Sequence, residues 1–171
     1  MHYFGKHSLK FQKHSHDATG LINPDLDDEE STPGGSKVDH STAGAQWVYR
    51  RLAAMGQKES GVLCGQMLGL CIASHHGAGL IDCLDDEGNV VWQKRFNKDD
   101  SLTHLSECLQ NADESVLRQA EGLADKALWV QRLAPRKAVL MRPEAQAGHQ
   151  IKEFYLGCLT RFLFSCLIDA D

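Results

Sequence analysis

Apolar residues recur at helical spacing along most of the chain. Between residues 39 and 55 they fall three or four positions apart, which is the period of an amphipathic helix. Residues 59–76 are apolar on most sides, which predicts a helix at the centre of the fold. The same spacing predicts further helices over residues 101–109, 114–133 and 144–171, and one or two helical turns within residues 1–15.

Two segments interrupt this helical pattern. In residues 83–92 the turn-forming run 85–89 is followed by Val90, Val91 and Trp92, which predicts a small β-hairpin. Residues 16–37 are rich in proline, glycine and acidic side chains, and predict a flexible acidic loop. We therefore expect one all-α domain over residues 1–171, with a small β-hairpin insertion and the loop at about residues 16–37.

The last predicted helix has a continuous apolar stripe, which we expect to face the core. Its members are Ile151, Tyr155, Cys158, Phe162 and Cys166, with Phe154, Leu159 and Leu163 beside them. Trp47 falls on a similar stripe of an earlier helix and is expected in the core as well. None of the six cysteines forms a Cys-x-x-Cys pair, so small buried thiols in a reducing compartment are expected.

Composition and charge narrow the functional classes. The chain has 171 residues and a net charge of −5, whereas a protein that holds duplex DNA by electrostatics alone is normally basic. Phosphate binding would then need positive charge from another source, such as a metal ion. We find neither a membrane-spanning stretch nor a secretory signal, and expect a cytoplasmic protein. Solvated faces are expected for one set of basic residues, with a DNA track as the alternative for some of them: Lys94, Arg95, Lys98, Arg132, Arg136 and Lys137.

Four of the nine histidines stand where predicted helices begin or end: His2, His40, His75 and His76. His40 opens one helix, and the His75-His76 pair closes the next. In an antiparallel helix pair these two ends lie at the same pole, so the three imidazoles are expected to converge. Imidazole is a common ligand of transition metals, and the pattern therefore predicts a metal site.

Four segments together resemble the HD domain of the CRISPR-associated helicase–nuclease of type I systems. They occur in the family's order: His2-Tyr3-Phe4-Gly5-Lys6 with Phe11-Gln12, Asp39-His40-Ser41-Thr42-Ala43-Gly44-Ala45, Ile72-Ala73-Ser74-His75-His76-Gly77 with Gly79-Leu80-Ile81-Asp82, and the terminal run from Arg161 to Asp171. The resemblance implies an HD-domain helical bundle with one or two metal ions, which cuts single-stranded DNA in CRISPR interference. It implies the CRISPR helicase and the surveillance complex as partners, and no membrane.

The resemblance also implies roles for single residues. His2 matches the histidine of the HD pair, and Lys6 matches a lysine that contacts phosphate. His40, His75 and His76 match the ligands of the second metal, and Asp171 matches a ligand of the first, with Asp169 as the alternative. Lys6 and His40 are thus the expected catalytic residues. The metal is expected to be manganese, iron, cobalt, nickel or zinc.

The chain departs from the family pattern at one position that matters for chemistry. Tyr3 stands where the family has the aspartate that bridges the two metals, and the family's upstream histidine ligand has no counterpart before Met1. We therefore expect a piece of an HD domain that is truncated at both ends, or a decayed copy of one, with impaired activity. Two alternatives remain: an inactive scaffold that docks to the helicase or the surveillance complex, and an HD phosphohydrolase acting on nucleotides. The stretch His40–Ala45 favours the nuclease over the phosphohydrolase.

Overall fold

The protein folds into a set of helices, as the apolar spacing predicts. The computed structural model describes residues 4–19, 40–55, 58–75, 79–80, 85–125 and 148–170. The elements are η1 (Phe4–His7), α1 (Leu9–Thr19), α2 (His40–Ala53), α3 (Lys58–Ser74), α4 (Trp92–Phe96), α5 (Asp100–Thr103), α6 (Leu105–Asn111), α7 (Glu114–Asp125) and α9 (Gly148–Asp169). Within these ranges there is no β-strand, which confirms the all-α prediction.

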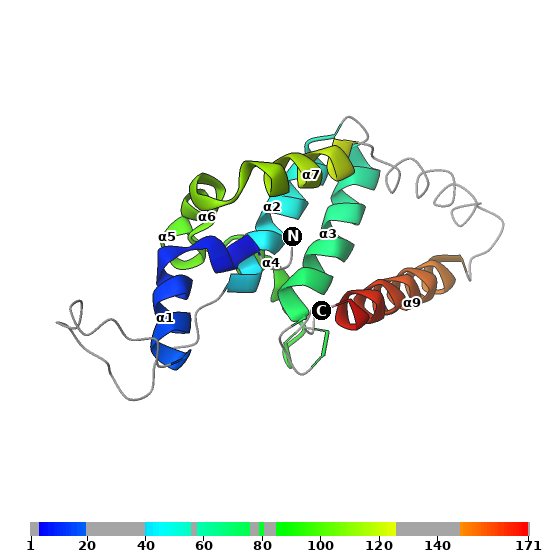
Figure 1. The fold of residues 1–171 in the computed structure, drawn as a ribbon. Helices are drawn as coiled ribbons and strands as arrows, with labels where there is room; N and C mark the ends of the chain where they lie inside the picture. The colour runs from blue at the N-terminus through cyan, green and yellow to red at the C-terminus, as the bar shows by residue number, and fades with distance from the viewer. Residues whose placement is uncertain are drawn as a thin grey trace, which may run out of the picture.

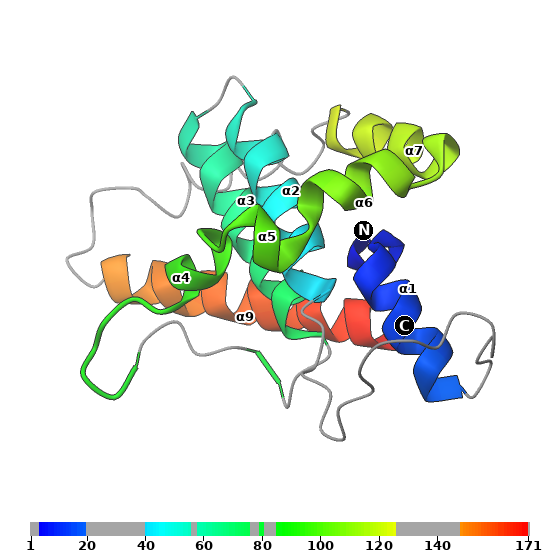
Figure 2. The ribbon, with the colours of Figure 1, turned by 90° about the vertical axis from the view of Figure 1, so that its left-hand side faces the viewer.

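Helices α2 and α3 lie side by side at the centre and run in opposite directions (Figure 1). α2 is contacted by η1 and by the short helices α4 to α7, so the residues that follow α3 fold back over α2. α9 instead crosses α3, as Figure 2 shows from the side. Most of the other described elements therefore pack on the α2–α3 pair, whereas α1 packs on η1.

The two central helices approach closely because one face of α3 has glycines four residues apart. A Cβ atom at Gly61 would overlap the carbonyl oxygen of Leu52. A Cβ at Gly65 would lie 3.0 Å from the carbonyl oxygen of Tyr49, which is tighter than ordinary van der Waals contact. Any side chain at these positions would push α2 away from α3. The glycines thus set both the distance between the helices and their register.

The same register continues toward the end of α3. A Cβ at Gly69 would lie 3.3 Å from the carbonyl oxygen of Ala45 and 2.6 Å from the ring of Phe96. Four residues further on, the carbonyl oxygen of Ala73 accepts a hydrogen bond of 3.3 Å from the Ser41 hydroxyl. The first turn of α2 is therefore held against the last turn of α3.

Two apolar clusters hold the helices together. The larger one consists of Ala45, Val48, Leu52, Cys64, Ile72, Ala73 and Phe96. The smaller one joins η1 to α2 and α6 through Phe4, Ala43, Leu105 and Cys108. Trp47 packs against both clusters, which confirms its predicted place in the core.

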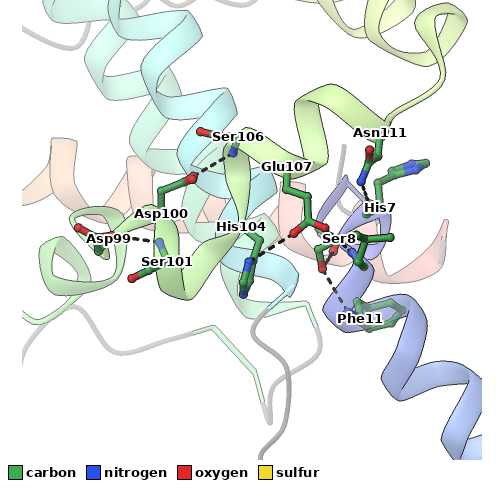
Figure 3. Close-up of polar contacts among 12 residues, drawn as sticks. His7, Ser8, Phe11, Asp99, Asp100, Ser101, His104, Ser106, Glu107 and Asn111 are labelled. Atoms are coloured by element: carbon green, nitrogen blue, oxygen red, sulfur yellow. Dashed lines mark hydrogen bonds and ion pairs between the residues drawn. The ribbon is translucent and has the colours of Figure 1, made fainter. Parts of the chain in front are cut away.

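Polar contacts anchor the N-terminal elements to α6 (Figure 3). The Leu9 amide donates to the Glu107 carboxylate over 2.8 Å, and the other oxygen of that carboxylate lies 3.4 Å from Nδ1 of His104. The Asn111 side chain donates to the backbone carbonyl of His7. His104 itself adopts a left-handed backbone conformation with φ 54°, which divides the single helix predicted over 101–109 into α5 and α6.

The predicted β-hairpin is not seen among the described residues of this segment, 85–92, although its turn forms. The Asp85 amide donates to the carbonyl of Asn89 over 3.0 Å, which closes the turn. Trp92 then begins helix α4 instead of a return strand. The reason is tertiary: the rings of Trp92 and Phe96, one helical turn apart, both pack against Tyr49 of α2. Burial of both rings on one helix face outweighs the local β propensity.

The orientation expected for α9 is wrong as well. The aromatic residues Phe154, Tyr155 and Phe162 are 67%, 53% and 64% exposed, and Cys158 and Cys166 are exposed beside them. The opposite face packs on the bundle, where Leu167 contacts the larger cluster. α9 is apolar on both faces, so its periodicity alone could not decide which face is buried. Among the described helices, none has the length and apolarity that crossing a bilayer requires.

The acidic loop predicted at 16–37 falls mostly outside the described residues. Helix α1 extends to Thr19, so positions 16–19 are helical and differ from the prediction. Residues 20–39 lie outside the described ranges, as does the part of the helix predicted over 114–133 that follows Asp125.

The five described cysteines divide into two groups, which differs from the expectation of buried thiols; Cys83 lies outside the described residues. Burial raises the pKa of Cys64, Cys71 and Cys108 to about 11, whereas Cys158 and Cys166 are exposed.

At pH 8 we expect iodoacetamide to modify the exposed pair, Cys158 and Cys166, first. The three buried thiols should react only after unfolding, as peptide mapping by mass spectrometry would show. Because unfolded thiols ionise near ~8.5, the free energy of unfolding should fall as the pH rises from there to about 11. Equal labelling rates at the five described thiols would contradict this.

Candidate metal centre

The candidate centre lies where α2 begins and α3 ends. α2 starts at His40, and His75 directly follows the last residue of α3. The hydrogen bond from the Ser41 hydroxyl to the Ala73 carbonyl joins the residue after His40 to the residue two positions before His75. Ser41 and Ala73 are 32 positions apart along the chain, so the start of α2 and the end of α3 meet at one pole of the bundle.

A hydrogen bond to the backbone favours one tautomer of the His75 ring. His75 is 5% exposed, and its Nδ1 lies 2.6 Å from the carbonyl oxygen of Ile72. A carbonyl can only accept, so Nδ1 must have the proton in this contact. In the neutral imidazole the lone pair is then on Nε2, which is the atom left to bind a metal. A hydrogen bond of this kind orients many metal-binding histidines.

The chemistry of the donor set fits a transition metal, since imidazole suits zinc, copper, iron and nickel. The side chain of His40 and the whole of His76 lie outside the described residues, as do His2, Tyr3 and Asp171. Among the side chains that the structure does describe, no three histidine, cysteine or acidic residues gather in a metal-binding cluster. The ligand set thus remains a prediction, which the position of His75 and the start of α2 support.

Arg95 reaches this pole from α4, and its expected solvated position is wrong. It is partly buried, and its Nε donates to the hydroxyl of Thr42 over 3.2 Å. Its Nη1 donates to the carbonyl oxygen of Ala73 over 3.1 Å. One side chain thus links the first turn of α2 to the last turn of α3. A basic residue on a short helix has no periodic pattern that would have predicted this contact.

The other predicted residues lie on separate elements. Lys6 belongs to η1, which packs on α2, and its amine lies 5.9 Å from the centre of the Phe11 ring. Asp169 is exposed at the end of α9. In Figures 1 and 2 this end of α9 lies beside the lower end of α3, and Leu167 packs against the cluster that contains Ala73. The end of α9 is therefore close to the same pole.

A signal for the helix register was present in the sequence and was missed. Glycines at 61, 65 and 69 are followed by Ala73 at the same spacing, and this row of small residues lies against α2. Such a row permits close approach of two helices wherever it occurs. It would have added close approach and register to the antiparallel pairing that the helix ends already predict.

The architecture is that of an all-helical domain with histidines at one pole of its central helix pair. A family model described as "Cas3, HD domain" matches residues 1–151. The chain therefore belongs to the Cas3 HD domain family, which confirms the resemblance seen in its motifs. No curated protein and no solved structure matches the chain.

Proposed function

We propose that this chain is a metal-dependent nuclease domain that acts on single-stranded DNA, with His40, His75 and His76 as metal ligands. The observation that carries the proposal is the pole itself, where the Ser41–Ala73 hydrogen bond joins the start of α2 to the end of α3. The Nδ1 contact of His75 leaves Nε2 as the ligand atom. Membership of the Cas3 HD domain family supports a hydrolytic nuclease activity.

In this proposal, different residues of the chain bind the metal ions and the phosphate. His40, His75 and His76 hold one divalent ion, for which manganese, iron, cobalt, nickel and zinc all match the imidazole set. His2 and Asp171, or Asp169 in its place, would contribute to a second ion. When bound, such ions activate a water molecule and neutralise charge on the phosphate. Lys6 adds a positive charge from η1.

The net charge of the protein is consistent with phosphate binding by metal ions and by Lys6. The net charge is −5, so long-range attraction of DNA by the domain as a whole is weak. Local positive charge at the pole therefore has to hold the phosphate. We propose that the CRISPR helicase and the surveillance complex deliver the single strand, since the family belongs to that machinery. The cytoplasm is the compartment in which this would take place.

A second candidate function is an inactive scaffold, and Tyr3 is the observation that favours it. The family has an aspartate at this position, which bridges two metal ions. A tyrosine phenol has a pKa near ~10 and remains neutral at physiological pH, so it is a poor bridge. In that case the domain would keep at most one ion and would act by docking to the helicase or the surveillance complex.

Metal content and DNA cleavage of the unmodified chain and of Tyr3→Asp separate the two functions. We expect at most one ion per chain and weak, manganese-, cobalt- or nickel-dependent degradation of single-stranded DNA by the unmodified chain. Tyr3→Asp should raise the metal content toward two ions and increase cleavage, because it restores an anionic bridge. The measurements are elemental analysis of the purified proteins and gel assays of a labelled oligonucleotide.

Three other results would change the assignment. Two ions and rapid cleavage in the unmodified protein would show that Tyr3 does not impair the site. Metal binding without cleavage in both proteins would favour the scaffold. Hydrolysis of free nucleotides in preference to DNA would favour the phosphohydrolase.

A further inference from the structure

The guanidinium of Arg95 joins the two helix ends that frame the candidate metal centre. Its Nε donates to Thr42, and its Nη1 donates to the carbonyl of Ala73. Thr42 lies two residues after His40, and Ala73 lies two residues before His75. A planar guanidinium fixes both donors in one rigid fork, so the two acceptors are held at a set distance from each other.

The acceptor on α3 is one that the helix cannot satisfy itself. The last four carbonyl groups of an α-helix have no intrahelical donor, and Ala73 is the penultimate residue of α3. Its oxygen accepts from Arg95 and from the Ser41 hydroxyl, so both of its lone pairs are used. The positive guanidinium also lies at the negative end of the α3 dipole. Arg95 therefore caps α3 and ties that cap to α2.

Arg95 itself is placed by contacts that do not involve the pole. The ring of Phe96 is 6% exposed and packs edge-on against Tyr49 at 5.2 Å between ring centres. The buried Gln46 side chain donates to the backbone carbonyls of Phe96 and Lys98 over 3.0 and 2.9 Å. These contacts hold α4 on α2 independently of Arg95, and they fix the position of the Arg95 backbone.

We propose that Arg95 is a positioning residue for the candidate metal centre. By clamping Thr42 to Ala73 it sets the separation of His40 and His75, and it steadies the last turn of α3 in which Ile72 accepts from the His75 ring. This inference rests on the proposed function for the identity of the ligands. The clamp is a property of the polypeptide alone and is testable without metal.

The test compares Arg95→Met, which keeps the apolar stem, with Arg95→Lys, which keeps one charge but not the fork. Calorimetric titration with Ni²⁺ should show affinity roughly 10–100-fold weaker for Arg95→Met, the range typical for residues that orient metal ligands. Arg95→Lys should fall between it and the unmodified protein.

Two matched controls separate positioning from charge and from general stability. Arg118→Met removes an exposed cation on α7 that pairs with Glu114, and should leave the affinity unchanged. Leu52→Ala opens the core near the far end of α2, and should lower the melting temperature of the metal-free protein without changing the affinity. If Leu52→Ala weakens Ni²⁺ binding as much as Arg95→Met does, the effect is general and the positioning role is wrong.

A measurement on metal-free protein distinguishes failure of this inference from failure of the proposed function. The Nδ1 proton of His75, observed by ¹⁵N–¹H NMR, should exchange with water at least several-fold faster in Arg95→Met, because the last turn of α3 loses its clamp. Unmodified protein that binds no Ni²⁺ would overturn the proposed function but leave this result standing. Unchanged exchange, or unchanged affinity in a protein that does bind Ni²⁺, would overturn the role of Arg95.

Discussion

Replacing Gly61 by alanine should destabilise the protein by about 2–3 kcal/mol, even though alanine is the better helix former. The added Cβ would meet the carbonyl oxygen and carbon of Leu52 and the Cα of Ala53, all of which are backbone atoms that cannot rotate away. α2 would have to move off α3 along its length. We expect the melting temperature to fall by roughly 4–12 °C, measured by calorimetry or circular dichroism.

Gly122 provides the matched control for this change. It lies in helix α7, and a Cβ built on it meets no atom within 4 Å. Gly122→Ala should therefore stabilise the protein by roughly 0.5–1 kcal/mol, which is the gain expected from helix propensity alone. If both substitutions stabilised the protein equally, close packing of α2 on α3 through glycine would be disproved.

Loss of either histidine at the pole should abolish tight metal binding. His40→Ala or His75→Ala removes one of three proposed imidazole ligands, and the two imidazoles that remain hold a divalent ion poorly. We expect the affinity for Mn²⁺ or Ni²⁺ to fall by more than the roughly 10–100-fold typical of residues that only orient a ligand. Isothermal titration and elemental analysis of the purified variants would measure the loss.

His16→Ala is the control for the loss of a histidine as such. His16 and Asp17 form a literal His-Asp dipeptide in the sequence, but His16 lies exposed on α1. The variant should bind metal as the unmodified protein does. Metal loss in His16→Ala with retention in His40→Ala would place the centre on α1 instead. The free energy of unfolding should also be measured for each metal-free variant. This is needed because His75 is buried and its removal leaves the Ile72 carbonyl without its donor.

Only part of the candidate centre could be predicted from the sequence. His75 was recognised because it ends an apolar helix, and the antiparallel pole was inferred from two helix boundaries; the Ser41–Ala73 contact agrees with that inference. Arg95 could not be recognised, because its role depends on where α4 packs. That position results from Phe96, whose ring fits over Gly69, a contact between residues 27 positions apart in the sequence.

The sequence by itself determined the helical class, the places of α2 and α3, and membership of the HD family. These follow from apolar spacing, end signals and short motifs, all of which are local along the chain. The tertiary structure alone decided that Trp92 begins a helix, that Tyr155 faces outward and that Arg95 is partly buried. Each of these depends on which distant surface is available for burial. Propensity and periodicity are local properties of the sequence, so they do not predict which distant surface a residue will pack against.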